Sequence, residues 1–119
     1  MAQDFERAVA SDSTSDINIG TTARTVVTSD SDDAIVGIRL ANVTTSQIAV
    51  DVFVETAAAG GSDLNVYLIK NAPIPSGSSL ELIDGGSKIV LQNGDVLKVK
   101  SDTADSLNCY VSFVDAIST

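Results

Sequence analysis

The chain has 119 residues and a mass of 12.3 kDa, which is enough for one domain with one hydrophobic core. Seven basic residues against 16 acidic ones give a net charge of −9, so we expect no binding to nucleic acids or anionic membranes, because the electrostatic attraction would have the wrong sign. The chain has no histidine and a single cysteine, and it therefore lacks the side chains that most often transfer protons, ligate metals or attack substrates near neutral pH, which predicts no enzymatic activity, no cofactor and no small-molecule substrate.

The first 33 residues are richer in acidic residues, Ser and Thr than the rest of the chain. Phe5 and Val9 lie four residues apart, the spacing at which two side chains meet on a helical turn. A helix this short is marginal in water on its own. We therefore predict that residues 1–33 form an extended N-terminal arm with a first strand near 18–28, loose when isolated and ordered against another subunit. Residues 34–119 are predicted to form the folded domain.

Alternating apolar and polar residues begin at Ala34 and are typical of strands that bury one face. The first two alternating runs are 34–41 and 48–55, and a short polar stretch at 42–47 separates them. A short polar connection between two such runs favours an antiparallel hairpin. The sequence therefore predicts that these two strands pair with each other.

Gly, Pro, Asn and Asp divide the rest of the chain into short strands. Pro73 and Pro75 interrupt the strand pattern because proline has no backbone donor. Asp84-Gly85-Gly86 predicts a turn, and Asn93-Gly94-Asp95 is the strongest hairpin signal in the sequence. The further strands are predicted at 64–71, 80–83, 88–91, 96–100 and 107–115.

These runs indicate an all-β fold, an antiparallel β-sandwich of about eight strands with an extended N-terminal arm. A jelly roll and an immunoglobulin-like sandwich give similar strings of short strands, so both topologies remain open. Aromatic residues make up only 4% of the chain, which predicts a core of Val, Ile, Leu and Ala. Cys109 lies on the same face of the last strand as Val111 and Phe113, and we predict that it fills the core.

Carboxylates are the remaining candidates for metal chemistry. The stretch Asp30-Ser31-Asp32-Asp33 offers oxygen ligands of the kind that calcium prefers. It lacks the glycine and the later glutamate of the helix-loop-helix calcium site. We therefore predict a solvated loop and no metal site.

The location of the protein can be addressed from its cysteine count and its N-terminus. A lone cysteine cannot form an intramolecular disulfide, which fits synthesis in a reducing cytoplasm. Asp4 and Glu6 beside Arg7 are unlike a secretory signal, and no run approaches the ~18 apolar residues of a membrane span. We expect a protein made in the host cytoplasm without a membrane anchor.

Two aromatic residues are predicted to face away from the core. Phe53 alternates with Val52 and Val54, and Tyr67 occupies the equivalent position in a later strand. An outward aromatic side chain is a candidate anchor for a partner, although it can also be covered by other residues of the same sheet face. The predicted partner-binding residues are Phe5, Arg7, Val9, Phe53 and Tyr67.

Three stretches carry a resemblance to a known family. They are AIVGIRLAN at 34–42, VYLIKNAPIPSGSSLEL at 66–82 and KIVLQNGDVLKV at 88–99. In this order they resemble small virion proteins of tailed bacteriophages, over residues 34 to about 115. The resemblance implies a β-sandwich mounted on a virion, with no catalytic residues to carry over; the N-terminal arm lies outside it.

The predicted function is that of a capsid decoration or cement protein, a homo-oligomer that binds the major capsid protein or another virion protein and stabilises the shell. A tail, collar or fibre-associated structural module is the first alternative. A carbohydrate-binding module for host attachment is the second.

Overall fold

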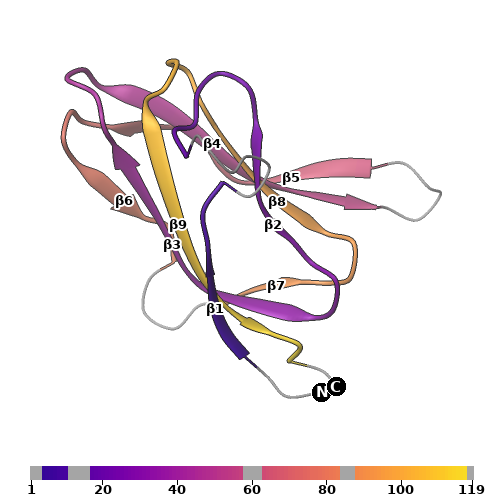
Figure 1. The fold of residues 1–119 in the computed structure, drawn as a ribbon. Coiled ribbons are helices and arrows are strands. Elements are labelled where there is room, and N and C mark those ends of the chain that lie inside the picture. Colours follow the sequence, from indigo (N-terminus) through magenta and orange to yellow (C-terminus); the bar gives the residue numbers. More distant parts are fainter. Residues whose placement is uncertain (1–3, 11–16, 58–62, 84–87, 118–119) are drawn as a thin grey trace.

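The computed structural model describes residues 4–10, 17–57, 63–83 and 88–117, and the regular secondary structure in these ranges is entirely β-strand (Figure 1). No helix among these residues is long and apolar enough to cross a membrane. The described residues form nine strands. In chain order they are β1 (Asp4–Ala8), β2 (Arg24–Thr28), β3 (Asp33–Asn42), β4 (Ile48–Ala57), β5 (Asp63–Ile74), β6 (Ser79–Glu81), β7 (Ile89–Leu91), β8 (Val96–Ser101) and β9 (Leu107–Asp115).

The strands form two antiparallel sheets that pack face to face. The five-stranded sheet has the order β1-β9-β3-β6, and β7 also pairs with β3. The four-stranded sheet has the order β2-β8-β4-β5. The predicted all-β antiparallel sandwich is therefore confirmed, with strands from the N-terminal region included in both sheets.

The core lies between the sheets and is almost entirely aliphatic, as the composition predicts. Alternation along β3 and β4 turns every second side chain inward, so that Ile38, Leu40 and Val52 have no exposed surface. Cys109 is 4% exposed and belongs to this cluster, which confirms its predicted place. The fully buried residues include Ile19, Ile35, Ile38, Leu40, Val50, Val52, Leu91, Leu97, Val99, Leu107 and Val111.

The predicted hairpin between runs 34–41 and 48–55 is wrong, because β3 and β4 belong to different sheets. The connecting loop is an arch held by the Asn42 side chain. Asn42 Nδ2 donates to the carbonyl oxygens of Ser46 at 2.7 Å and Ile74 at 2.9 Å, and Asn42 Oδ1 accepts from the Thr44 amide at 2.9 Å. These bonds satisfy the polar groups of a chain that crosses between the sheets.

The Asn93-Gly94 turn exists, but it does not join paired strands. β7 lies in the five-stranded sheet and β8 in the four-stranded sheet, so the predicted hairpin is again an inter-sheet connection. Gly94 has a φ of 95°, which requires glycine. Hydrogen bonds with Ser29 anchor the turn, from the Gly94 amide at 2.8 Å and to the Asp95 carbonyl at 2.9 Å. The predicted Asp84-Gly85-Gly86 turn lies outside the described residues.

The described N-terminal residues are part of the sandwich. Residues 4–8 form strand β1, paired with β9, so the predicted helical pairing of Phe5 with Val9 is wrong. Ile19 bridges to Leu107, and β2 supplies the buried Val26 and Val27. An extended strand satisfies its backbone groups on the edge of a sheet, which a single helical turn cannot do. The domain boundary at residue 33 stays a prediction.

Candidate interaction surface

A row of apolar residues crosses the outer face of the five-stranded sheet. Phe5 on β1 is opposite Val114 on β9, which is opposite Ala34 on β3, which is opposite Val90 on β7. Phe5 is 86% exposed and Val90 is 56% exposed, whereas Ala34 is 6% exposed. We call these four residues the apolar row. The side chains at its two ends, Phe5 and Val90, are exposed, and Ala34 between them is buried.

Carboxylates gather at the end of the same sheet, one residue beyond the apolar row. Asp4 is directly opposite Asp115, and carboxylate oxygens of Asp30, Asp33 and Asp115 lie within 4.8 Å of one another. Like charges directly opposite each other destabilise a strand pair. Burial raises the pKa of the Glu6 carboxyl, and the nearby charges of Asp115 and Asp4 raise it further. We call Asp4, Glu6, Asp30, Asp33 and Asp115 the acidic end.

Asp33 is the buried member of the acidic end, at 2% exposed. It accepts hydrogen bonds from the Ser29 hydroxyl at 2.9 Å, the Ser31 hydroxyl at 3.0 Å and the Ala116 amide at 3.1 Å. Burial raises its pKa, but the Ala116 amide and the hydrogen bonds from neighbouring side chains lower it more, so the pKa lies below its ordinary value. The stretch is thus not the fully solvated loop that was predicted, because Asp33 ties the chain to the C-terminal end of β9.

Asp115 responds in the opposite direction. Its hydrogen bond with Asp33 raises its pKa above the ordinary value, and burial and the Asp33 charge act in the same direction. The two carboxyl groups therefore favour a state in which Asp33 is ionised and Asp115 holds a proton more readily. Because the hydrogen bonds of Asp33 already come from protein donors, its carboxylate has a structural role in this arrangement.

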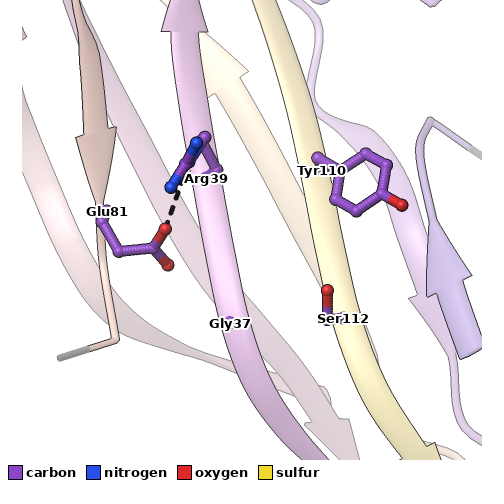
Figure 2. A pocket seen from close by; sticks show the side chains of 5 residues that line it. All are labelled: Gly37, Arg39, Glu81, Tyr110 and Ser112. Atoms are coloured by element: carbon purple, nitrogen blue, oxygen red, sulfur yellow. Dashed lines mark hydrogen bonds and ion pairs between the residues drawn. The ribbon is translucent and has the colours of Figure 1, made fainter. Parts of the chain in front are cut away.

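A shallow hollow of about 450 Å³ lies further along the same face (Figure 2). It is lined by Gly37, Arg39, Glu81, Tyr110 and Ser112. The missing side chain at Gly37 leaves space between the flanking strands. Glu81 fixes one wall, since it accepts from the Ile38 amide at 3.1 Å and pairs with Arg39 Nε at 3.3 Å. A second hollow of about 200 Å³ adjoins it and includes Val9 in its lining.

On the outer face of the four-stranded sheet, Phe53 is covered by neighbouring side chains, whereas Tyr67 is 43% exposed. Phe53 is opposite Tyr67, their ring centroids are 5.1 Å apart, and Phe53 is only 6% exposed. The Lys70 ammonium lies 4.4 Å from the centre of the Tyr67 ring and 3.6 Å from an Asp51 oxygen. Phe53 and Tyr67 therefore share a face of the sheet. Phe53 is covered by other residues of that face, which was the alternative to its being exposed.

The five predicted partner-binding residues fall into two groups on opposite faces of the molecule. Phe5, Arg7 and Val9 belong to the five-stranded side, and Phe53 and Tyr67 to the other sheet. Their role in binding stays a prediction. Sequence reasoning missed the other members of the apolar row and the contribution of Asp115, because only strand register brings these residues beside Phe5.

Comparisons with known proteins show a likeness of fold. No protein family and no curated protein matches the chain. A chain of the T13 IBDV viral particle superposes with a TM-score of 0.55 at 10% identity, covering 96% of this chain. A chain of the disulfide-linked pili that form Bacillus endospore appendages superposes with a TM-score of 0.50 at 14% identity, covering 95% of this chain.

The two neighbours differ in how much of their own length is matched. This protein spans 31% of the viral particle chain and 84% of the pilus chain. At these identities the likeness establishes the fold, a β-sandwich that occurs in subunits of a viral particle and of a pilus. The predicted similarity to structural virion proteins is supported at this coarse level.

Proposed function

We propose that the protein is a structural component of a bacteriophage virion, a decoration or cement protein that binds the capsid shell and stabilises it. The observation that carries the proposal is the likeness of fold over 96% of the chain to a protein of a viral particle. The resemblance of the sequence to small virion proteins of tailed phages points in the same direction. The proposed partners are the major capsid protein and further copies of this chain.

The proposed mechanism is binding without catalysis. A protein that binds the closed shell better than the opened shell stabilises the closed state by mass action. The stiff backbone of a two-sheet sandwich suits this task, because a preformed surface loses little conformational freedom on binding. The exposed apolar row gives such a surface a place where side chains can be buried against a partner.

The test is the copy number of the protein in purified virions from its source, measured by quantitative mass spectrometry against the major capsid protein. A decoration protein is expected at a copy number comparable to that of the capsid subunit. Particles stripped of the protein should release their DNA at a lower temperature, and adding back the purified protein should restore the original temperature. Absence from the particles, or restoration by an unrelated acidic protein, would contradict the proposal.

A tail, collar or fibre-associated module is the second candidate. The match to the pilus chain favours it, since it covers 95% of this chain and 84% of the pilus subunit and so relates two proteins of similar extent. Such a module would be present at a few copies per particle, and the same measurement separates the two functions.

A carbohydrate-binding module is less well supported. Stacking on a sugar would require an open ring face at Tyr67, and the Lys70 ammonium lies over that ring. Binding on a glycan array that is lost in Tyr67→Ala would revive this candidate.

A further inference from the structure

We propose that the hollow between Arg39 and Tyr110, on the outer face of the five-stranded sheet, is a binding site for a neutral saccharide. The proposal goes beyond the proposed function, because it adds a ligand site to a structural protein. It does not involve Tyr67, whose ring is covered on the other sheet. It is carried by two observations, a glycine that neither the backbone nor the packing requires and the hydrogen-bonding groups that surround this glycine.

Gly37 forms the floor of the hollow, although the fold does not need glycine at this position. It follows an irregularity in the pairing of β3 with β9, but its φ is not positive, unlike those of Gly77 and Gly94. A Cβ atom at Gly37 would meet nothing nearer than Glu81 Oε2 at 3.7 Å, an ordinary van der Waals distance. Glycine inside a strand costs stability relative to alanine and often marks a place where a ligand approaches closely. What the missing side chain provides here is open space above the two strands.

One wall of the hollow carries an ion pair. Arg39 is opposite both Tyr110 on β9 and Glu81 on β6. Its Nε pairs with Glu81 at 3.3 Å, and no described residue accepts a hydrogen bond from its two terminal nitrogens. Glu81 also accepts from the Ile38 amide at 3.1 Å, which holds the carboxylate in place. This wall therefore presents fixed donors and acceptors side by side, and its two charges cancel.

The other side of the hollow provides an aromatic ring and hydroxyl groups. Tyr110 is 51% exposed, and Figure 2 shows its ring nearly face-on, on the far side of β9 from the ion pair. Among the described residues no cation lies over this ring, whereas Lys70 lies over Tyr67. The hydroxyls of Tyr110 and Ser112 make no hydrogen bond with another described residue. They can therefore bond to a ligand without breaking a bond within the protein.

These groups match a neutral saccharide better than other ligands. A sugar ring carries neighbouring hydroxyls that both donate and accept, and its C–H groups can pack on an aromatic face. An apolar ligand would leave the polar lining without partners. An anion would find its nearest uncompensated charge on Arg7, which is opposite Ser112 but does not line the hollow. The volume of about 450 Å³ lies within the range of about 300–1,000 Å³ that is usual for ligand sites.

A shallow site of this kind predicts weak binding by one copy of the protein. A ligand that stays partly in water gains little free energy to offset the freedom that it loses, so we expect a dissociation constant in the millimolar range. Many copies on one particle would raise the overall affinity through multivalency. This last consequence rests on the proposed function, whereas the site itself does not.

The test is to apply the purified protein to a glycan array and to titrate it with glucose, galactose, mannose, rhamnose and N-acetylglucosamine, followed by amide NMR. We expect at least one neutral sugar to shift the amide signals of Gly37, Arg39, Tyr110 and Ser112. Shifts confined to the four-stranded sheet, or no binding in either assay, would overturn the proposal. Binding restricted to sialylated or sulfated glycans and abolished by salt would overturn the neutral ligand and point to Arg7.

Two variants and a matched control provide the second readout. Gly37→Val should abolish binding because it fills the floor of the hollow, and the protein should stay folded because valine favours strands. Tyr110→Ala should weaken binding about tenfold, because the aromatic surface for the sugar is lost. The control is Tyr67→Ala, which removes a tyrosine of similar exposure, 43%, from the other sheet and should bind within about twofold of the wild type.

Thermal unfolding checks that each variant is folded. Unchanged binding by folded Gly37→Val protein would overturn the hollow as the site, and loss of binding in Tyr67→Ala alone would place a sugar site on the other sheet instead. These measurements use the isolated protein, so their failure leaves the proposed function standing. Absence of the protein from virions would overturn the proposed function and leave the saccharide site standing.

Discussion

The outer faces of the two sheets have similar alternating sequences but differ in how their apolar side chains are covered. On the four-stranded sheet, Phe53 has Tyr67 directly opposite and is 6% exposed. On the five-stranded sheet, Phe5 lies on the edge strand β1 opposite the smaller Val114 and is 86% exposed. An outward aromatic residue therefore indicates a binding site only where the chain does not cover it itself.

The pairing of charges also differs between the two sheets. On the four-stranded sheet opposite charges meet, with Lys98 3.3 Å from Glu55 and Lys70 3.6 Å from Asp51. At the end of the five-stranded sheet like charges meet, with Asp4 opposite Asp115. The four-stranded sheet thus brings opposite charges together, whereas the acidic end brings like charges together.

The largest expected effect comes from exchanging the two phenylalanines for alanine. Phe53→Ala should lower the free energy of unfolding by about 3 kcal/mol, because it removes a buried ring and leaves a cavity beside Tyr67. Phe5→Ala should change it by less than about 0.5 kcal/mol, since an exposed side chain loses little on truncation. Urea denaturation followed by fluorescence of the two tyrosines measures both. Equal losses would mean that Phe5 is packed in solution and that the two faces do not differ.

Loss of the Asp33 carboxylate should have the next largest effect. Asp33→Ala leaves the Ala116 amide without its acceptor in a buried site and removes one of the two acceptors of the Ser29 and Ser31 hydroxyls, which should lower the free energy of unfolding by about 2 kcal/mol. The matched control is Asp30→Ala, which removes an exposed carboxylate of the same acidic end. Similar losses for the two variants would contradict a structural role for Asp33.

The pH dependence of Asp33 follows from its lowered pKa. A carboxyl whose pKa is lower in the folded state contributes stability above its unfolded pKa, and this contribution is lost as the pH falls through the folded value. Asp33→Asn should therefore lose stability relative to the wild type at pH 7, and the difference should shrink on acidification below about pH 4. A difference that does not change with pH would contradict the assigned ionisation.

The fold class could be predicted from the sequence because alternation with a period of two is a local property. Strand pairing could not, because a short polar loop suits both a hairpin and an arch. Whether β3 and β4 pair as a hairpin or are joined by an arch between the sheets depends on contacts distant in sequence. One of these is the hydrogen bond from the Asn42 side chain to the Ile74 carbonyl, 32 residues away. For the same reason, Asn93-Gly94 correctly predicted a turn but wrongly predicted that the strands on either side of it pair with each other.

The candidate site was predictable only in part. Phe5 was selected for a helical pairing with Val9 that does not form, yet its exposure makes it the most prominent residue of the apolar row. Val90 could not be selected, because Ile89 and Leu91 beside it are also apolar and only register shows which of the three faces outward. The acidic end is assembled from three separate strands and loops, so composition alone could not locate it.

Removing one negative charge from the acidic end should change the stability less than the loss of Asp33 does, and in the opposite direction. The raised pKa of Asp115 means that its contribution to stability is present below its unfolded pKa and is lost as the pH rises through the folded value. Asp115→Asn should therefore stabilise the protein at pH 7 and lose this advantage near pH 3. Glu55→Gln on the other sheet should lower stability by about 0.3 kcal/mol, because there it breaks an opposite-charge pair. Destabilisation by both variants at pH 7 would remove the electrostatic difference between the faces.

The smallest expected effect is on Cys109, which lies on the inner side of the sheet that carries the apolar row. Burial raises the pKa of its thiol to about 12, so hardly any reactive thiolate is present at pH 8. The buried side chain is also shielded from a reagent in solution. Alkylation by iodoacetamide should be negligible in the folded protein and complete in urea, as read from the mass of the intact chain. A double variant with Phe5→Ser and Val90→Ser should remain equally protected, because the apolar row is on the opposite side of the sheet from the core. Rapid alkylation in that variant alone would mean that the row holds the five-stranded sheet closed, and its exposure would then reflect stability rather than docking.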